Sequence, residues 1–424
     1  MKILIKNGRV IDPANNIDDK LDVLIDNGTI AAVSANIDAD ADRTIDATGK
    51  LVTPGLVDIH VHLRDPGHEY KEDIVTGTRS AAAGGFTSLA CMPNTVPVND
   101  NKAITTYMIN KARCEGYANV FPICSITKGQ QGKSLVEMGD LQQAGCVGFS
   151  DDGLNVDNGE VLRRAMQYAD AFSMPIITHA EDTIIKGGGV MNEGAVSTEL
   201  GLMGNPWVAE AAAIARDLML AELTGARLHV CHISTRRSVE LIRDAKQRGV
   251  RVTCEVTPHH FTLTEEAVRG YDVNAKMGPP LRSADDVAAM KEGLADGTID
   301  AIATDHAPHH IDDKNVEFSV AANGLIGLET ALPLTLRLVD EGVIPLQRAV
   351  ACLSAAPAAA LNIARGNLSV GGAADVTVID SDLKWRVEEN NIRSKARNTP
   401  FMGQEMTGAA LFTICGGRIT FERQ

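Results

Sequence analysis

The stretch VDIHVHLRDPG, residues 57–67, is the part of the sequence that decides the fold. It places His60 and His62 one residue apart in an apolar run typical of a buried strand, and it ends in the turn residues Asp-Pro-Gly. Side chains two residues apart on a strand point to the same face of the sheet. Both imidazoles are therefore expected on one face of a strand, at positions where valine is ordinarily buried.

Similar apolar runs recur along the middle of the chain, and each precedes a turn and a stretch with helical spacing. The eight runs are LVDIHVHL, FTSLACMP, NVFPICSIT, CVGFSDD, PIITHAE, RLHVCHIS, RVTCEVTP and DAIATDHAP. Apolar strands joined by helices indicate a parallel sheet covered by helices, and eight such units favour a closed (β/α)8 TIM barrel. An open, doubly wound sheet is the alternative, but no G-x-G-x-x-G turn supports it.

The two ends of the chain have a different sequence pattern. Polar and apolar residues alternate there in short strand-like runs, and Asn7-Gly8 and Asn27-Gly28 are typical turn pairs. We predict an α/β protein in which residues 1–52 and 367–424 together build a small β-sandwich domain. Residues 53–366 would form the barrel.

Composition excludes several classes of protein. The 424 residues carry a formal net charge of -15 and no basic stripe, so nucleic acid is not an expected partner. The eight cysteines form no C-x-x-C pair, which indicates free thiols in a reducing compartment. No apolar run reaches the roughly 18 residues of a membrane span. We expect a cytoplasmic protein that does not enter a membrane.

Four further residues end strand runs on the same side of the predicted barrel, where side chains distant in sequence meet. They are Asp152, His179, His232 and Asp305. A lone H-x-H pair also fits an inert, hydrogen-bonded pair in the core. Together with these residues, however, His60 and His62 complete a set of four imidazoles and two carboxylates, which suits one or two divalent ions and zinc most naturally.

At this point the sequence resembles the amidohydrolase superfamily, and within it the type I dihydroorotases. The resemblance is carried by DIHVHLRDPG, CMPNT, GFSDDG, THAED, HVCHIST, TPHH, TDHAPH and GLETALP. Hydantoinases and allantoinases use a carboxylated lysine on the fourth strand, but the run AGCVGFSDDG contains no lysine. The resemblance implies an aspartate there, Asp152, although spacing alone does not separate it from Asp151.

The resemblance also implies how the ligands divide. His60, His62 and Asp305 would hold one zinc ion, His179 and His232 a second where it is present, and Asp152 would bridge or share. The reaction implied is the reversible cyclisation of N-carbamoyl-L-aspartate to L-dihydroorotate in pyrimidine biosynthesis. Zinc would lower the pKa of water from about 15.7 to about 7. Asp305 is the expected proton carrier.

The substrate carboxylate is expected to meet a second group of side chains. The family uses residues that correspond to Arg64, Asn94 and His309, with His62 close by, and arginine has the planar fork suited to a carboxylate.

Two positions depart from the family pattern. Gly278 stands where an asparagine is usual, and Asn323-Gly324 stand where Phe-Gly is common. We expect backbone groups of Asn323 and Gly324 to serve as donors to the substrate, with a backbone group or water in place of the missing amide at Gly278.

Two further expectations concern residues outside the ligand set. His229 has the opposite strand parity from His232, so we expect it to face the helices. The glycine-rich tract KGGGVMNEG, residues 186–194, has no following Lys-Ser/Thr, so it is interpreted as a mobile loop.

The expected partner is a small molecule, carbamoyl-aspartate or dihydroorotate. We also expect a homodimer, and an association with aspartate transcarbamoylase is left open. Two other functions remain as alternatives. One is another cyclic amidohydrolase, disfavoured by the missing lysine. The other is a non-catalytic partner of aspartate transcarbamoylase, disfavoured because no ligand is lost.

Overall fold

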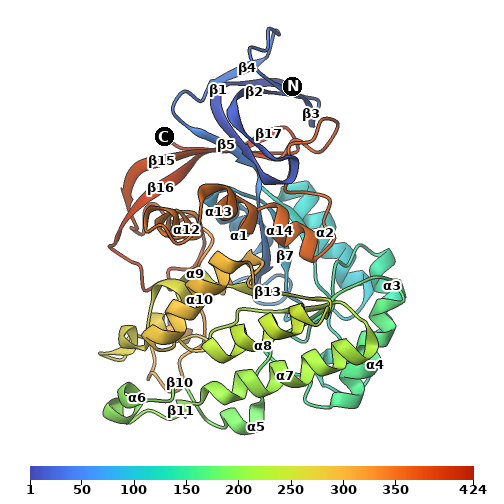
Figure 1. Cartoon of the computed structure of the whole chain (residues 1–424), viewed down its shortest axis with the longest axis vertical. Coiled ribbons are helices and arrows are strands. Elements are labelled where there is room, and N and C mark those ends of the chain that lie inside the picture. Colours follow the sequence, from blue (N-terminus) through green and yellow to red (C-terminus); the bar gives the residue numbers. More distant parts are fainter.

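The computed structural model describes all 424 residues, in a β-rich part formed by both ends of the chain and a larger part of strands and helices (Figure 1). The strands are β1 Lys2–Asp12, β2 Ile17–Asp26, β3 Thr29–Ser34, β4 Arg43–Asp46, β5 Leu51–Pro54, β6 Leu56–Val61, β7 Phe86–Cys91, β8 Asn119–Pro122, β9 Ile176–Thr178, β10 Met191–Asn192, β11 Gly204–Asn205, β12 Leu228–Val230, β13 Val252–Val256, β14 Ala301–Ile302, β15 Val376–Arg386, β16 Glu405–Cys415 and β17 Arg418–Glu422. The helices are α1 Ile74–Gly84, α2 Lys102–Glu115, α3 Met138–Gln143, α4 Gly159–Asp170, α5 Thr183–Lys186, α6 Ala195–Leu200, α7 Trp207–Thr224, α8 Arg236–Gln247, α9 Pro258–Thr262, α10 Ala284–Asp296, α11 Ile311–Lys314, α12 Ala331–Asp340, α13 Leu346–Cys352 and α14 Ala355–Ala360. The α/β class and the sheet built from both termini are confirmed.

The terminal sheet differs in one respect from the expected sandwich, because its eight strands form one continuous sheet. The order is β17-β16-β15-β5-β1-β2-β3, with β4 alongside β1. The reason is the length of β1, which pairs with β4 through residues 3–6 and with β5 through residues 9–10. A register shift between Ile5 and Gly8, with Asn7 at φ 65, separates these two pairings. Figure 1 shows both chain ends in this sheet.

The boundary expected after residue 52 falls inside β5. That strand runs to Pro54 and pairs with β15 in the terminal sheet. The next strand, β6, starts only two residues later and belongs to the parallel strands. The chain therefore passes from one part of the molecule to the other with almost no linker.

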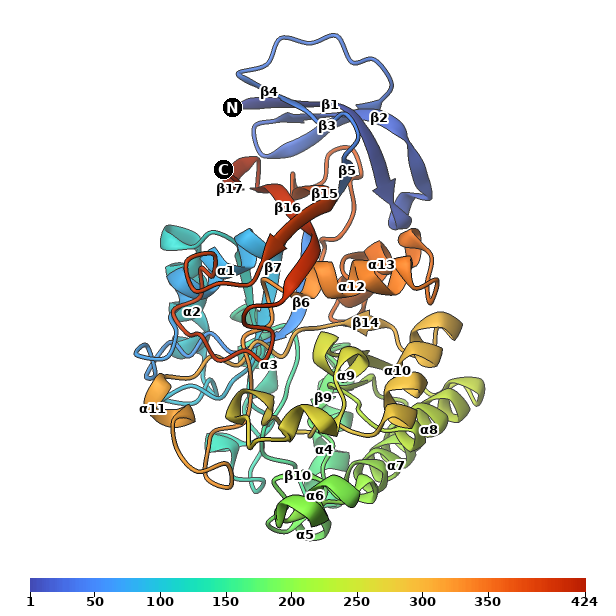
Figure 2. The ribbon, with the colours of Figure 1, turned by 90° about the vertical axis from the view of Figure 1, so that its left-hand side faces the viewer.

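The larger part contains two main parallel sheets, β6-β7-β8 and β14-β13-β12-β9, and a short parallel pair, β10-β11. Isolated parallel bridges connect the two main sheets: Cys124 with Phe149, Phe149 with Ile176, and Val61 with His306. The fourth predicted run, CVGFSDD, is not a regular strand; it takes part through the bridges of Phe149. Helices α7 and α8 lie side by side along one side of this part (Figures 1 and 2).

Helix α4 illustrates how sequence pattern and caps define these helices. Asn158 accepts hydrogen bonds from the first-turn amides, and Leu162, Ala165, Met166 and Ala169 bury one face. The apolar spacing in EVLRRAMQYADAF predicts a helix over residues 160–172 with Phe172 on its apolar face, and the observed helix is close to it but ends at Asp170. Phe172, expected on the apolar face, is 37% exposed.

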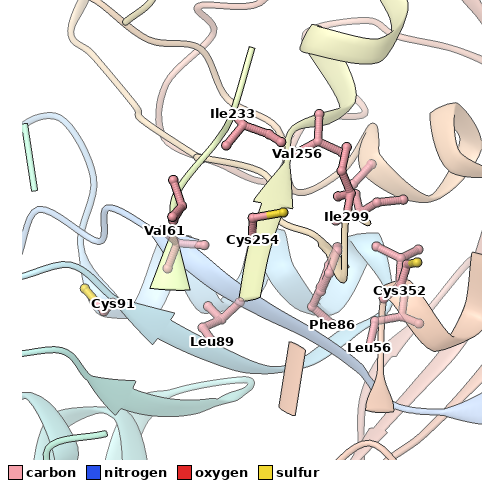
Figure 3. Packing of buried hydrophobic residues seen from close by; sticks show 14 of the residues in the cluster. Leu56, Val61, Phe86, Leu89, Cys91, Ile233, Cys254, Val256, Ile299 and Cys352 are labelled. Atoms are coloured by element: carbon pink, nitrogen blue, oxygen red, sulfur yellow. The ribbon is translucent and has the colours of Figure 1, made fainter. Parts of the chain in front are cut away.

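The main core lies between the parallel strands and the helices, and it is one cluster of 69 buried residues. Figure 3 shows several members of this cluster, with Cys254 between Val61 and Leu89 on one side and Val256 and Ile299 on the other. This packing holds the strands in place, so the polar side chains at their ends have fixed positions.

None of the helices has the length and apolar composition needed to cross a membrane.

The segment between β15 and β16 leaves the terminal sheet and contacts the parallel-strand part. Asn398 donates hydrogen bonds to the carbonyls of Ala307 and Gly324 and accepts one from the amide of His309. These contacts support the backbone around His309, although the sequence placed the whole of residues 367–424 in the β domain.

Candidate functional site

The sequence-predicted ligands come together at the carboxyl ends of the parallel strands. His60 lies on β6 and His62 directly after it, His179 follows β9, and His232 follows β12 by two residues. Two aspartates reach the same place, Asp152 after the bridge at Phe149 and Asp305 after β14.

One half of the cluster joins two imidazoles to both carboxylates. His62 Nε2 lies 3.0 Å from Asp305 Oδ1 and 3.6 Å from Asp152 Oδ2. His60 Nε2 lies 3.4 Å from Asp152 Oδ1 and 3.5 Å from Asp305 Oδ1. Four side chains from β6 and two distant loops thus face one small volume.

The other half consists of His179 and His232 beside the same Asp152. The two ring nitrogens that face each other, His179 Nδ1 and His232 Nε2, are 2.9 Å apart. They lie 3.7 and 4.0 Å from Asp152 Oδ1. Asp152 therefore borders both halves, as a bridging ligand would.

The cluster leaves polar atoms that no protein group satisfies. His60 Nε2 and Asp152 Oδ1 are buried without a hydrogen-bond partner. Buried polar atoms are nearly always paired, and an unpaired one costs about 1–3 kcal/mol. Both atoms point into the space between the imidazoles and carboxylates, and a cation placed there would satisfy them. The donors also fall into compact groups that could hold an ion, such as His60, His62 and Asp152.

Asn94 orients two of the candidate ligands. Its Oδ1 lies 2.9 Å from His62 Nδ1, and its Nδ2 donates to Asp152 Oδ2 at 3.2 Å. Because the amide oxygen only accepts, His62 Nδ1 carries the proton and Nε2 faces the cluster. The side chain predicted to bind substrate is thus also a support for the ligands.

The electrostatics keep the two carboxylates ionised. Burial alone would raise the pKa of Asp305, but His60 and His62 outweigh it and hold the pKa well below its usual range. Burial would likewise raise the pKa of Asp152, and the imidazoles around it lower it further. Burial lowers the pKa of His232 to about 3, with contributions from His179 and His60, so this imidazole is neutral and can bind a cation.

Three site residues have a left-handed backbone although none is glycine. They are Arg64 at φ 61, His232 at φ 31 and Asp305 at φ 48. Such conformations cost on the order of 1–3 kcal/mol each and persist where the surrounding structure imposes them. Here all three residues follow strand ends, and their side chains line the cavity described below.

The cluster forms the floor of a cavity of about 210 Å³. All of the residues predicted to contact substrate line it, namely His62, Arg64, Asn94, Gly278, His309, Asn323 and Gly324. Five of the six predicted metal ligands also line it, and the sixth, His60, lies beneath them and is fully buried.

The cationic end of the cavity is built around Arg64. Its Nε donates to the carbonyl of Pro308 at 3.2 Å, and its Nη2 lies 3.2 Å from His309 Nε2. His309 Nε2 also lies 2.8 Å from the carbonyl of Asn323, so this nitrogen carries the proton. Burial, together with Arg64 and Lys71, lowers the pKa of His309 to about 2 and leaves the ring neutral. Arg64 therefore keeps a donor group free to meet an anion.

The two departures from the family pattern lie side by side. A side chain at Gly278 would place its Cβ 3.2 Å from Asn323 Nδ2. The expectation that Gly324 offers a main-chain donor is wrong, because its amide donates to the carbonyl of Lys276 at 2.9 Å. Near Gly278 the available amide group is the Asn323 side chain.

Asp151 and Asp152, which spacing could not separate, have different surroundings. Asp151 accepts hydrogen bonds from the amides of Ile126 and Thr127 and from the Thr127 hydroxyl, away from the imidazoles. Asp152 lies within the cluster. Asp151 is thus held by a neighbouring loop, and Asp152 alone is free to act as a ligand.

The expectation that His229 faces the helices is wrong. Its Nε2 lies 3.0 Å from Glu255 Oε2, and Glu255 Oε1 lies 2.6 Å from His60 Nδ1. The prediction assumed that side chains alternate between the two faces from His229 to His232. This alternation does not hold, because β12 ends at Val230 and the backbone at His232 no longer follows the strand. Burial alone would raise the pKa of Glu255, but His60 and His229 lower it to about 2.

Lys186 is a cavity residue that the sequence did not identify. Its ammonium group contacts the carboxylate of Glu181, which lies 3.7 Å from His179 Nε2. The tract 186–194, interpreted as a mobile loop, includes the end of α5 and strand β10. The charged pair in THAED followed by Lys-Gly-Gly-Gly was the only available signal, and it does not distinguish a cavity residue from a surface one.

Comparison with known proteins yields consistent matches. Residues 49–238 match the family model described as Dihydro-orotase-like. The chain is 62% identical over 422 residues to a dihydroorotase of Syntrophotalea carbinolica, with 99% of each chain covered. It is 59% identical to a dihydroorotase of Geobacter metallireducens, with 100% of each chain covered. Among solved structures, L-hydantoinase from Arthrobacter aurescens matches with a TM-score of 0.89 and 30% identity, covering 99% of this chain and 96% of that one.

Proposed function

This chain belongs to the dihydroorotase family, and from that membership we propose that its histidine and aspartate cluster holds zinc for the reversible cyclisation of N-carbamoyl-L-aspartate to L-dihydroorotate. The observation that carries the proposal is the convergence of six candidate ligands at a cavity that Arg64 also lines. A metal and a carboxylate-binding arginine in one cavity suit a small cyclic amide that bears a carboxylate.

We infer that the parallel strands form a closed (β/α)8 barrel. The bridges of Phe149 connect the segment after β8 to β9, and the bridge from Val61 to His306 connects β6 to the segment after β14. The high TM-score against L-hydantoinase supports this arrangement. A barrel accounts for the meeting of side chains from every part of residues 53–366 at one mouth.

The donor set fits zinc. Imidazole and carboxylate ligands suit this ion, and the unpaired His60 Nε2 and Asp152 Oδ1 are placed to bind it. His60, His62 and Asp305 would hold one ion, and His179 and His232 a second, with Asp152 shared. When bound, zinc supplies an activated water near neutral pH and polarises the reacting carbonyl.

Asp305 is the proposed proton carrier. Its carboxylate faces the cluster and lines the cavity, so it can reach both the attacking water and the ring nitrogen. In hydrolysis the ionised carboxylate accepts a proton from water and then donates it to the leaving ring nitrogen. In cyclisation the protonated carboxyl acts first and the steps reverse.

Arg64 is proposed to bind the substrate carboxylate, with His309 and Asn94 beside it. We expect Arg64→Met to raise KM by about 10–100-fold, because a charge-assisted hydrogen bond contributes about 1.5–3 kcal/mol and 1.4 kcal/mol is tenfold. Steady-state kinetics would measure this, and metal content should stay at the wild-type level. An unchanged KM would show that the carboxylate binds elsewhere.

Asn323 is proposed to provide the amide that Gly278 lacks. We expect Asn323→Ala to raise KM by about 2–10-fold, the range for one hydrogen bond of about 0.5–1.5 kcal/mol. Adding Gly278→Asn to that variant should bring KM back toward wild type, because it returns an amide to the same place. If the double variant is no better than Asn323→Ala, the compensation between the two positions is refuted.

The activity itself is tested by assaying ring opening of dihydroorotate, hydantoin and allantoin in parallel with metal-loaded protein. The proposal predicts that dihydroorotate is the preferred substrate by a large factor. Preference for hydantoin would favour the other cyclic amidohydrolase activity, to which the likeness to L-hydantoinase points. Loss of all three activities in protein that holds metal would favour a non-catalytic role.

Other parts of the proposal concern assembly and location. We propose a homodimer in the cytoplasm, with carbamoyl-aspartate or dihydroorotate as the ligand and neither nucleic acid nor membrane as a partner. Light scattering of the purified protein, alone and with aspartate transcarbamoylase, tests the assembly.

A further inference from the structure

A chain of buried side chains lies beneath the cluster and ends on His60. Thr253 Oγ1 lies 2.8 Å from His229 Nδ1, His229 Nε2 lies 3.0 Å from Glu255 Oε2, and Glu255 Oε1 lies 2.6 Å from His60 Nδ1. The exposed fractions of His60, Glu255 and His229 are 0%, 0% and 1%. Neither Glu255 nor His229 lines the cavity, so neither can touch the substrate.

The two hydrogen bonds to Glu255 have a fixed direction. An ionised carboxylate only accepts, so His60 Nδ1 and His229 Nε2 both carry protons that they donate to Glu255. A neutral His229 would in turn accept from the Thr253 hydroxyl at Nδ1. With Nδ1 of His60 held by Glu255, Nε2 is the ring atom left to bind a cation, and it faces Asp152 and Asp305 at 3.4 and 3.5 Å.

We propose that Glu255, backed by His229, is a positioning residue that holds His60 in the tautomer and ring orientation needed to bind the metal. This inference rests on the proposed metal site. A carboxylate behind a metal-bound imidazole fixes the ring and increases its basicity, and losing such a partner lowers metal affinity by about 10–100-fold.

A purely structural role explains the chain less well. His60, Glu255 and His229 are almost fully shielded from solvent. An ionised carboxylate costs several kcal/mol when taken out of water, and apolar side chains of similar volume would pack there without that cost. Hydrogen bonds among β6, β12 and β13 could still serve to join the strands, so the test must separate metal binding from stability.

The test uses the full chain with Glu255→Gln, stripped of metal and titrated with Zn²⁺ against a chromophoric chelator. Glutamine keeps the shape but can no longer accept from both imidazoles with a charged group. We expect zinc affinity to fall by about 10–100-fold, with a much smaller loss of kcat at saturating zinc. Histidine Nδ1 proton resonances should also show loss of the His60 hydrogen bond.

A matched control is Glu329→Gln. Glu329 accepts hydrogen bonds from Ser80 and from the amides of Arg393 and Ser394, away from the cluster. Burial raises its pKa to about 7, so glutamine resembles the protonated form. This variant should bind zinc as the wild type does.

The outcomes separate this inference from the proposed function. Wild-type zinc affinity in Glu255→Gln would overturn the inference, whatever the change in stability. If Glu255→Gln does not fold, His229→Gln replaces it, with a smaller loss of zinc affinity expected and unchanged affinity contradicting the inference. Absence of dihydroorotate ring opening by the wild type would instead refute the proposed function and leave the zinc titration interpretable.

Discussion

Replacing Asp305 with asparagine is expected to lower kcat by about 10³-fold in both directions of the reaction, within the 10²–10⁴ range of a lost general acid–base group. Asparagine keeps an oxygen near His62 Nε2, now 3.0 Å from Asp305 Oδ1, but it cannot carry a proton. The measurement is steady-state kinetics of cyclisation and ring opening at saturating metal, with bound metal determined for each sample. Wild-type kcat in a metal-loaded variant would exclude Asp305 as the carrier.

The pH dependence of the wild type examines the same role. Ring opening needs the ionised carboxylate, so its rate should rise with pH, whereas cyclisation needs the protonated form and should fall. One group acting in both directions requires a single apparent pKa shared by the two profiles. Unrelated pKa values would indicate two different groups.

Replacing Asp152 with asparagine is expected to remove metal and, with it, nearly all activity. Asp152 borders both halves of the cluster, with carboxylate oxygens 3.4 Å from His60 Nε2 and 3.7 Å from His179 Nδ1. Losing its charge should lower metal affinity by more than roughly 10–100-fold, which is typical when a residue that only hydrogen-bonds to a metal ligand is lost. Elemental analysis after dialysis, together with the ring-opening assay, measures both effects.

Asp151→Asn is the matched control, because Asp151 and Asp152 are adjacent and both 4% exposed. Asp151 accepts its hydrogen bonds from Ile126 and Thr127, so its variant should keep metal and activity and instead lose about 1–3 kcal/mol of stability. The reverse result, with metal lost from Asp151→Asn and kept in Asp152→Asn, would exchange the roles of the two residues.

The sequence pattern predicted the candidate ligands well where they recur at the ends of the predicted strands. His60 and His62 lie in the first apolar run, and His179 and Asp305 come at the ends of later ones. Because the ends of parallel strands meet at one edge, their convergence could be predicted. Choosing Asp152 over Asp151 needed the surrounding contacts. Both carboxylates end the same run, and only the neighbouring loop of Ile126 and Thr127 shows which one is already bound.

Other features left no local signal. His229 was misplaced because alternation along a strand applies only while the strand lasts, and β12 ends at Val230. Asn398 is 89 residues from His309, whose amide it contacts, and no periodicity indicates that the segment between β15 and β16 returns to the site. The single terminal sheet depends on a register shift near Asn7. In the sequence, the pair Asn7-Gly8 indicated a hairpin turn and not a shift within one long strand.

The most direct test of the central claim is a crystal structure of the zinc-loaded protein with dihydroorotate bound. The account predicts zinc held by His60, His62 and Asp305, with Asp152 shared, and the substrate carboxylate on Arg64. Zinc bound away from the two imidazoles of β6, or a substrate carboxylate that does not contact Arg64, would contradict it.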